Sequence, residues 1–249
     1  MKTPHFYAVI IGSEILNGRR EDKHFLYIRD ALLRLGHTLF SSFTIKDDPL
    51  LIHNTFAMIK NDPYAVMFSF GGIGSTPDDL TRQIAADVFS DGILVPHEQF
   101  TRDIMERFGD AAYPHRIHMA DLPKNSLLLP NVVNNMSGFY LEDRYFFMPG
   151  FPEMSHPMVE EALMKFFPQA TKTYRRTLIA QTSENTLIDV MEKMDTRVDF
   201  SSLPMINGGN PIVEISVASE EEKLCEYSFH LFVEALKAKS ISYEIIKNN

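Results

Sequence analysis

The fold class is indicated most clearly by YAVMFSFGGIGSTPDDLTRQIAADVF, residues 64–89. Its first part, residues 64–70, is almost continuously apolar, which is typical of a strand buried on both faces. Glycines then mark a sharp turn, after which Ile84, Ala85 and Val88 share one face of a helix. The stretch therefore predicts a strand, a glycine-rich turn and a helix.

The same order of elements occurs twice before residue 64. Residues 6–11 are continuously apolar, and residues 25–35 follow with apolar positions at steps of three and four. Residues 38–45 predict the next strand, and Asp48 as N-cap with Pro49 at the first helical position predicts the next helix. Strands that alternate with helices form parallel βαβ units, so we expect an α/β protein with a mostly parallel sheet.

The pattern becomes less regular towards the middle of the chain. Residues 100–108 are amphipathic, but residues 110–138 lose periodicity and are expected to carry loops and short strands. A strand at 144–148 and a helix at 154–166 follow. Phe167-Pro168-Gln169 ends that helix, which suggests a domain boundary at 168–172.

A second, smaller domain is predicted after this boundary. Its expected elements are a strand at 174–180, a helix at 183–194, a hairpin of 198–203 and 212–218, a helix at 220–238 and a strand at 241–246. The order βαββαβ is the split-βαβ pattern of small α+β domains. We therefore expect domains at 1–168 and 172–249.

Composition excludes several classes of protein. The 249 residues are 45% hydrophobic and 23% charged, which excludes a disordered or low-complexity chain. The formal charge of −9 opposes binding to nucleic acid. A single cysteine, Cys225, excludes an intramolecular disulfide, and no apolar stretch is long enough to cross a membrane. Without a secretory signal, we expect a cytoplasmic protein.

The glycine-rich turn at residues 71–76 is a candidate anion site. Its glycines permit a sharp turn and close approach of a ligand, and the amide groups at a helix start attract phosphate. Asp78 and Asp79 add oxygen ligands of the kind that divalent cations prefer. The alternative needs no ligand: Thr76 as N-cap and Asp79 three residues later make a capping-box-like helix start.

Two other loops carry candidate polar groups. The segment Gly12–Gly18 follows the first strand and offers Glu14, which could contact a ligand hydroxyl. Arg19, Arg20 and Lys23 follow it and could pair with phosphates, although we favour solvated side chains there, with Asp22 capping the helix. The prolines and glycine of residues 148–154 fix a sharp strand-to-helix passage.

Together these three segments resemble the competence/damage-inducible protein A (CinA) family, which is built on the molybdopterin-binding domain of molybdenum-cofactor biosynthesis proteins. The family motifs Gly-Asp-Glu-Leu-Leu-x-Gly, Gly-Gly-Leu-Gly-Pro-Thr-x-Asp-Asp-Leu-Thr and Pro-Gly-x-Pro-x-Glu-Met correspond to residues 12–18, 71–81 and 149–154, the last of which is one residue shorter than the motif. The resemblance covers essentially the whole chain. It implies a three-layer α/β domain, a smaller α+β domain and a nucleotide or pterin pocket at the strand ends.

The resemblance also implies roles for individual residues. Asp79 and Glu14 would be catalytic, and Asp79 with Asp78 would hold a divalent metal ion. The remaining ligand-binding positions would be Gly12, Ser13, Gly71, Gly72, Gly74, Ser75, Thr76, Asn131, Pro149 and Gly150. This chain departs from the family at Ser13, where an Asp is usual, at Ser75, where a Pro is usual, and throughout residues 131–138.

We therefore expect metal-dependent hydrolysis of a nucleotide diphosphate such as ADP-ribose or a dinucleotide. The alternative is a non-catalytic protein that binds molybdopterin or a nucleotide at a partly altered site. Longer family members carry a nicotinamide-mononucleotide deamidase domain, for which this chain leaves no room, so deamidation is not expected. The resemblance further implies a homo-oligomer, most simply a dimer, with a small-molecule ligand and no nucleic-acid or membrane partner.

Overall fold

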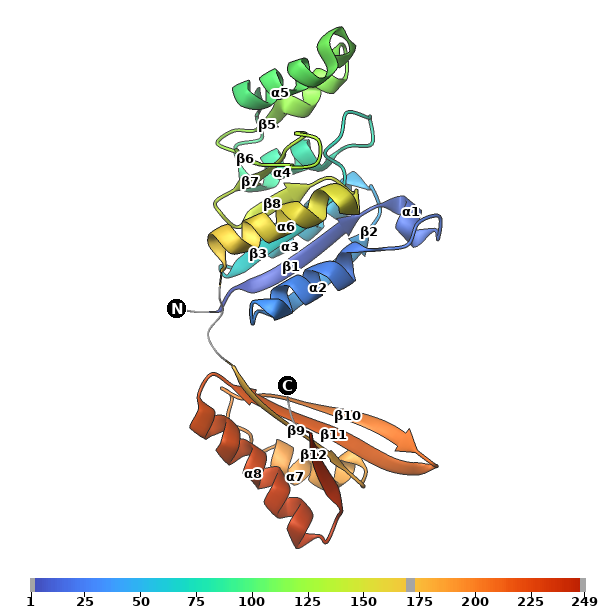
Figure 1. Ribbon diagram of the computed structural model, residues 1–249, viewed down its shortest axis with the longest axis vertical. Helices are drawn as coiled ribbons and strands as arrows, with labels where there is room; N and C mark the ends of the chain where they lie inside the picture. The colour runs from blue at the N-terminus through green and yellow to red at the C-terminus, as the bar shows by residue number, and fades with distance from the viewer. Residues whose placement is uncertain (1–2, 169–172, 247–249) are drawn as a thin grey trace. The chain divides into compact units, whose positions relative to one another are not determined.

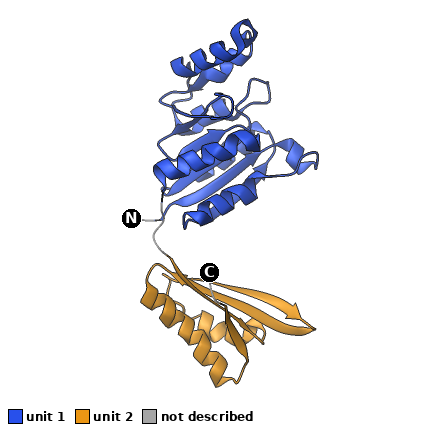
Figure 2. Cartoon of the chain, in the orientation of Figure 1, with its two compact units in different colours: residues 1–170 blue, residues 171–249 orange. Residues whose placement is uncertain are grey.

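The computed structural model describes residues 3–168 and 173–246 of the chain (Figure 1). The chain divides into two compact units, residues 1–170 and 171–249 (Figure 2). The boundary expected at residues 168–172 falls largely on residues 169–172, which lie outside the described part.

The first unit is an α/β domain whose central sheet has six strands. Their order is β2-β1-β3-β8-β7-β6, and β2, β1, β3 and β8 run parallel while β7 is antiparallel to its neighbours. The strands are β1 (His5–Ile11), β2 (Leu39–Ile45), β3 (Ala65–Phe70), β6 (Leu127–Leu129), β7 (Gly138–Leu141) and β8 (Tyr145–Met148). The mostly parallel sheet that the alternating pattern predicts is confirmed.

Helices cover both faces of this sheet. One face packs against α2 (His24–Arg34) and α6 (Pro152–Phe166), and the other against α3 (Pro49–Lys60) and α4 (Thr81–Phe89) (Figure 1). The strand β1 shows why its sequence is apolar throughout. Its alternate residues enter two different cores, because successive side chains of a strand point to opposite faces. The expected three layers are therefore present.

The irregular middle of the chain forms a separate subdomain of short elements. These are β4 (Leu94–Pro96), α5 (Glu98–Phe108), the 3₁₀ turns η1 (Gly109–Ala112) and η2 (Arg116–Ala120), and β5 (Asp121–Pro123). The strands β4 and β5 pair antiparallel. The subdomain is attached to the core on the α3/α4 face through Phe100 and Ile104.

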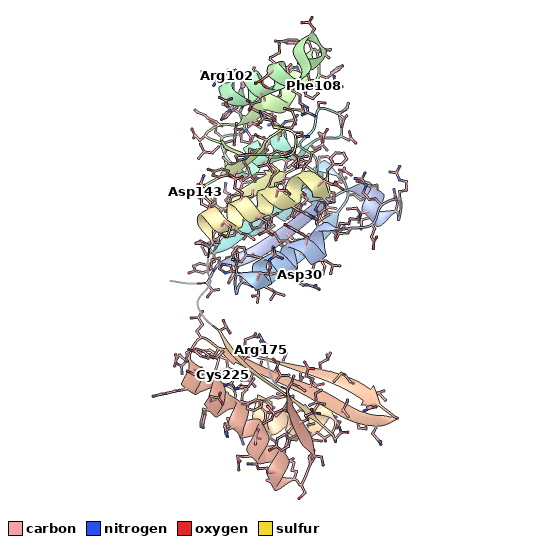
Figure 3. The ribbon with its side chains drawn as sticks, viewed as in Figure 1. Asp30, Arg102, Phe108, Asp143, Arg175 and Cys225 are labelled. Carbon is pink, nitrogen blue, oxygen red and sulfur yellow. The ribbon has the colours of Figure 1, made fainter. Side chains whose placement is uncertain are left out.

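The second unit is an α+β domain with an antiparallel sheet of order β10-β11-β9-β12. Its elements are β9 (Tyr174–Ala180), η3 (Glu184–Leu187), α7 (Ile188–Met191), β10 (Asp199–Asn207), β11 (Asn210–Ser219), α8 (Glu222–Ala238) and β12 (Tyr243–Ile246). Cys225, which is labelled in Figure 3, is a buried residue of α8. The smaller α+β fold is confirmed.

One helix of this unit is shorter than predicted. Residues 183–194 form a 3₁₀ turn and a single turn of α-helix rather than one continuous helix. The hydroxyl of Thr182 donates to the hydroxyl of Thr186 at 2.8 Å, so polar side chains bond within the turn. Such local hydrogen bonds compete with a regular helix.

Among the described residues, no helix is long and apolar enough to span a bilayer.

Candidate functional site

A cavity of about 540 Å³ opens where the first unit's parallel strands end. This volume lies within the range typical of small-molecule sites, roughly 300–1,000 Å³. Ligands of open α/β sheets bind at this carboxyl edge. The lining residues come from the segments that follow β1, β2, β3, β6 and β8 and from the middle subdomain: Ile11, Glu14, Arg20, Asp47, Gly71 to Thr76, Asp78, Asp79, Phe100, Phe108, Arg116, Met119, Asn134, Met136, Ser137, Pro149, Gly150, Phe151 and Met154.

The glycine-rich loop is tied to the first residue of α4. The buried hydroxyl of Thr81 donates to the carbonyl oxygen of Gly71 at 3.0 Å, and the Thr81 amide donates to the carbonyl of Gly72 at 2.9 Å. Both glycines have positive φ, +102° and +71°, a conformation that other residues adopt only with strain. The turn therefore depends on glycine at these two positions.

The next residue of α4 holds the rest of the loop. The guanidinium group of Arg82 donates to the carbonyl oxygens of Ile73 and Gly74. Burial lowers the pKa of Arg82, and its Nε is buried with no hydrogen-bond partner in the described part of the chain. Arg82 thus fixes the glycine-rich loop against α4. This residue was not selected from the sequence.

These contacts orient the amide groups of the loop. In a trans peptide the C=O and the N–H of the same peptide group point in opposite directions. Because the carbonyls of residues 71–74 are directed at α4, the N–H groups of the same four peptides point away from α4. Those N–H groups belong to residues 72–75, which line the cavity. Within the described chain, none of them donates to another residue. The loop therefore offers four free donors in a row, an arrangement that binds anions.

Asp79 lies beside this loop, before the helix begins. Its Oδ2 accepts hydrogen bonds from the amide and the hydroxyl of Thr76, and a Cβ added to Gly74 would lie 2.5 Å from it. The predicted helix start at Thr76–Pro77 is wrong, because α4 begins at Thr81. The hydrogen bond from the Thr76 amide to the Asp79 carboxylate, which a capping box requires, is present, but it closes a turn before the helix rather than the helix start. Asp78 is fully exposed, and a hydrogen bond from Thr76 lowers its pKa.

Glu14 lines the same cavity from α1 (Ser13–Leu16). Its Oε1 lies 3.7 Å from a guanidinium nitrogen of Arg20, which also lies over the ring of Phe151 at 5.5 Å. Arg20 is therefore part of the cavity wall, contrary to the expectation of a purely solvated side chain. The helix cap expected at Asp22 is wrong by one residue, because the N-cap of α2 is Lys23, although the Asp22 carboxylate accepts from the amide of His24 at 2.7 Å.

Gly12 and Ser13 stand next to the cavity but do not line it. The amide of Ser13 donates to Oδ2 of Asp47 at 2.8 Å, and the amide of Asp47 donates to the Ser13 hydroxyl at 3.3 Å. Asp47 therefore supplies a cavity carboxylate beside the position where the family usually has an aspartate. It was missed, although it follows β2, which pairs in parallel with β1.

Pro149 and Gly150 form the part of the cavity wall next to the glycine-rich loop, where a Cβ added to Gly150 would lie 3.4 Å from the Cα of Gly71. The buried ring of His24 contacts Gly150 of this wall. Its Nε2 lies 3.3 Å from the carbonyl oxygen of Gly150, and the ring stacks on Phe70 at 4.5 Å. Burial lowers the pKa of His24, because the charged ring is poorly solvated there.

Asn131 does not line the cavity. Its side-chain amide donates to Oδ1 of Asn134 at 2.8 Å and to the carbonyl of Met136 at 3.0 Å, so it fixes the loop of residues 131–138 internally. Asn134 and Met136 reach the cavity instead. The ligand-binding position expected at Asn131 is thus a support for its neighbours.

The remaining wall is apolar and comes from the middle subdomain, with Phe108 at the end of α5 (Figure 3). The guanidinium carbon of Arg116 lies 4.9 Å from the Phe108 ring centroid, and an Arg116 nitrogen donates to the carbonyl of Ala111 at 2.7 Å. This subdomain has no recognisable motif, so its contribution to the site was not predicted. The cavity thus combines one polar and one apolar side.

The carboxylates of the cavity can accommodate only certain metals. The described residues contain no group of three or more His, Cys, Asp or Glu side chains that could hold an ion by themselves. This excludes a protein-only cage among them. Mg²⁺, however, is commonly held by one or two carboxylates plus substrate phosphates and water. Asp79, whose Oδ1 is not used by Thr76, and the exposed Asp78 fit that mode of binding.

The sequence is similar to that of several known proteins. It is 26% identical over 228 residues to a CinA-like protein of Acaryochloris marina, covering 87% of this chain and 54% of that one. It is 32% identical over 161 residues to a CinA-like protein of Citrifermentans bemidjiense, covering 62% and 38%. The chain thus spans about half or less of the length of these relatives.

Structural comparison agrees. A crystal structure of the protein CinA with unknown function from Thermoplasma acidophilum superposes with a TM-score of 0.58 at 25% identity, covering 65% of this chain and 97% of that one. The family profile described as a probable molybdopterin binding domain matches residues 7–169. The chain therefore belongs to the family of the probable molybdopterin binding domain, as a CinA-like member.

Proposed function

We propose that this protein hydrolyses the diphosphate bond of a nucleotide such as ADP-ribose with the help of a divalent cation. The observation that carries the proposal is the row of four free amide groups at residues 72–75, set beside Asp78 and Asp79 in one cavity. Backbone amides bind phosphoryl oxygens, and the carboxylates provide ligands for a cation that such oxygens also bind.

The charge of the cavity argues that a cation takes part. Four carboxylates line it, against two guanidinium groups, so a bare diphosphate would be repelled. A divalent cation bound by the carboxylates would offset this excess of negative charge and would offer the diphosphate oxygens a positive ligand. The cavity is therefore better suited to a cation–diphosphate complex than to a free anion.

The residues would divide the reaction between them. Asp79, with Asp78, would orient the diphosphate through the cation, and Glu14 would accept a proton from the attacking water. As the water oxygen bonds to one phosphorus, the P–O–P bond breaks, giving AMP and ribose 5-phosphate from ADP-ribose. The amides of Gly72 and Gly74 would donate to the phosphoryl oxygen on which negative charge grows.

A second candidate function is binding of a nucleotide or pterin without turnover. Two observations favour it: the described residues lack a three-ligand metal group, and the altered loop at 131–138 places Asn134 and Met136 in the wall. An apolar wall of this kind can pack against the flat ring of a bound pterin or nucleotide whether or not the ligand is hydrolysed.

A product assay separates the two functions. The purified chain is incubated with ADP-ribose and Mg²⁺, Mn²⁺ or excess chelator, and AMP and ribose 5-phosphate are quantified. Equimolar products that appear only with metal support hydrolysis. Binding measured by calorimetry without product formation under any metal contradicts hydrolysis and supports the second function.

A further inference from the structure

A second pocket of about 500 Å³ adjoins the main cavity. The two share Ser75, Thr76 and Arg116, so only this loop segment and one arginine separate them. The remaining residues of the second pocket are Pro77, Ala111, Tyr113 and His115. A ligand that extends past Thr76 would therefore leave the main cavity and enter this pocket.

The two pockets differ in chemistry. The main cavity has four carboxylates, whereas none lines the second pocket, which instead has the guanidinium group of Arg116 and the imidazole of His115. Tyr113, which is 60% exposed, also lines this pocket. Aromatic rings and guanidinium planes are the groups on which nucleobases stack.

Arg116 stands at the junction of the pockets and is held there. Its guanidinium group lies over the ring of Phe108 and donates to the carbonyl of Ala111. A cation fixed in this position can contact the diphosphate of a ligand that passes from one pocket to the other.

We propose that the second pocket binds a nucleobase at the far end of the substrate, so that the preferred substrates carry an aromatic base on each side of the diphosphate. This inference rests on the proposed site for the diphosphate and deepens it. Tyr113 is the stacking platform, and Arg116 contacts the phosphates between the two bases.

Two ligands differ in the second base alone and so test this inference. ADP-ribose and di(adenosine-5′) diphosphate share the adenosine, the diphosphate and the second ribose, but only the latter has a second adenine. Their methylene-bridged analogues resist hydrolysis, so calorimetry with Mg²⁺ measures binding alone. If one additional base stacks in the second pocket, the analogue with two bases should bind with an affinity about tenfold higher or more.

Variants of Tyr113 identify the source of the preference. Tyr113→Ala should bring the affinity ratio of the two analogues close to one, while Tyr113→Phe should retain it because the ring remains. Tyr227→Ala, at an equally exposed tyrosine of α8, is the matched control and should not alter the ratio. A wild-type ratio near one, or a ratio unaffected by Tyr113→Ala, overturns the inference.

The outcome is independent of turnover. If the ratio behaves as expected but natural ADP-ribose is not hydrolysed, the second pocket stands and the proposed hydrolysis fails. If ADP-ribose is hydrolysed but the second base adds no affinity, the hydrolysis stands and the second pocket fails.

Discussion

Asp79 and Thr76 are joined by two hydrogen bonds: Oδ2 of Asp79 accepts from the Thr76 amide at 2.8 Å and from the Thr76 hydroxyl at 2.6 Å. One carboxylate oxygen thus closes the turn, and the other remains for a ligand. The carboxylate therefore has a structural and a proposed chemical role, which can be separated by mutation.

We predict that Asp79→Asn lowers kcat/KM for ADP-ribose by about a hundredfold or more, since losing one charge-stabilising contact costs about 3 kcal/mol. Thr76→Val removes only the hydroxyl contact and should lower kcat/KM by less than about tenfold. Asp30→Asn, on the exposed surface of α2 (Figure 3), is the control. Equal effects of Asp79→Asn and Thr76→Val would show that the carboxylate acts only by closing the turn.

Arg82→Met should weaken binding of inorganic diphosphate with Mg²⁺. Without the guanidinium group, the carbonyls of Ile73 and Gly74 lose their donors and the loop amides lose their orientation. The expected loss of affinity, about tenfold, corresponds to one hydrogen bond to a charged group. Titration calorimetry measures it, with Arg102→Met on exposed α5 as control. Unchanged affinity would mean that Arg82 does not position the loop.

Gly71→Ala should destabilise the first unit strongly. A Cβ at this position would lie 2.4 Å from the backbone carbonyl of Ile11, and φ is +102°. Gly18→Ala has a φ of +76° but no atom within 4 Å of the added Cβ. We expect a loss of about 1 kcal/mol for Gly18→Ala, from the left-handed backbone alone, and clearly more for Gly71→Ala. Urea unfolding compares them, and equal losses would contradict the clash.

The free energy of unfolding should fall as the pH falls below about 6.5, the ordinary pKa of histidine. Burial lowers the pKa of His24 and of His156, whose rings lie 5.5 Å apart. The unfolded chain therefore binds more protons than the folded chain in this range, so acid favours unfolding. His24→Phe, which can still stack on Phe70, should flatten the profile between pH 7 and pH 5.

His53→Gln, at an exposed position of α3, is the control for this experiment and should keep the slope of the parent protein. A slope that His24→Phe leaves unchanged would assign the acid sensitivity to other groups.

The sequence predicts those parts of the fold that depend on local patterns. The apolar run at residues 6–11 indicates a strand buried on both faces, and β1 has alternate residues in two cores. Asp48 is the N-cap of α3, accepting from the amide of Leu51 at 2.8 Å, with Pro49 following. Such signals act over a few residues and are therefore readable without the tertiary structure.

Features that depend on distant contacts were not predicted. The start of α4 at Thr81, rather than near Pro77, follows from hydrogen bonds back to Gly71 and Gly72. The wall that Phe108 and Arg116 contribute was also missed. Phe108 ends the amphipathic segment at residues 100–108 and Arg116 lies in the stretch without periodicity, and nothing in the residue order of either indicates that it faces the glycine-rich loop. Asp47 was also missed, but the sequence did contain a signal for it, since neighbouring parallel strands end at one edge of the sheet.

The attachment of the glycine-rich loop to Thr81 and Arg82 also determines what a ligand must do on arrival. Four consecutive carbonyls are held by residues of the helix, so the amide donors are oriented by the fold itself. A mobile phosphate-binding loop loses conformational entropy when it closes on its ligand. In this protein the loop loses that entropy when the chain folds. Binding energy from the phosphates is therefore not spent on ordering the loop, and remains for affinity and for selection among ligands.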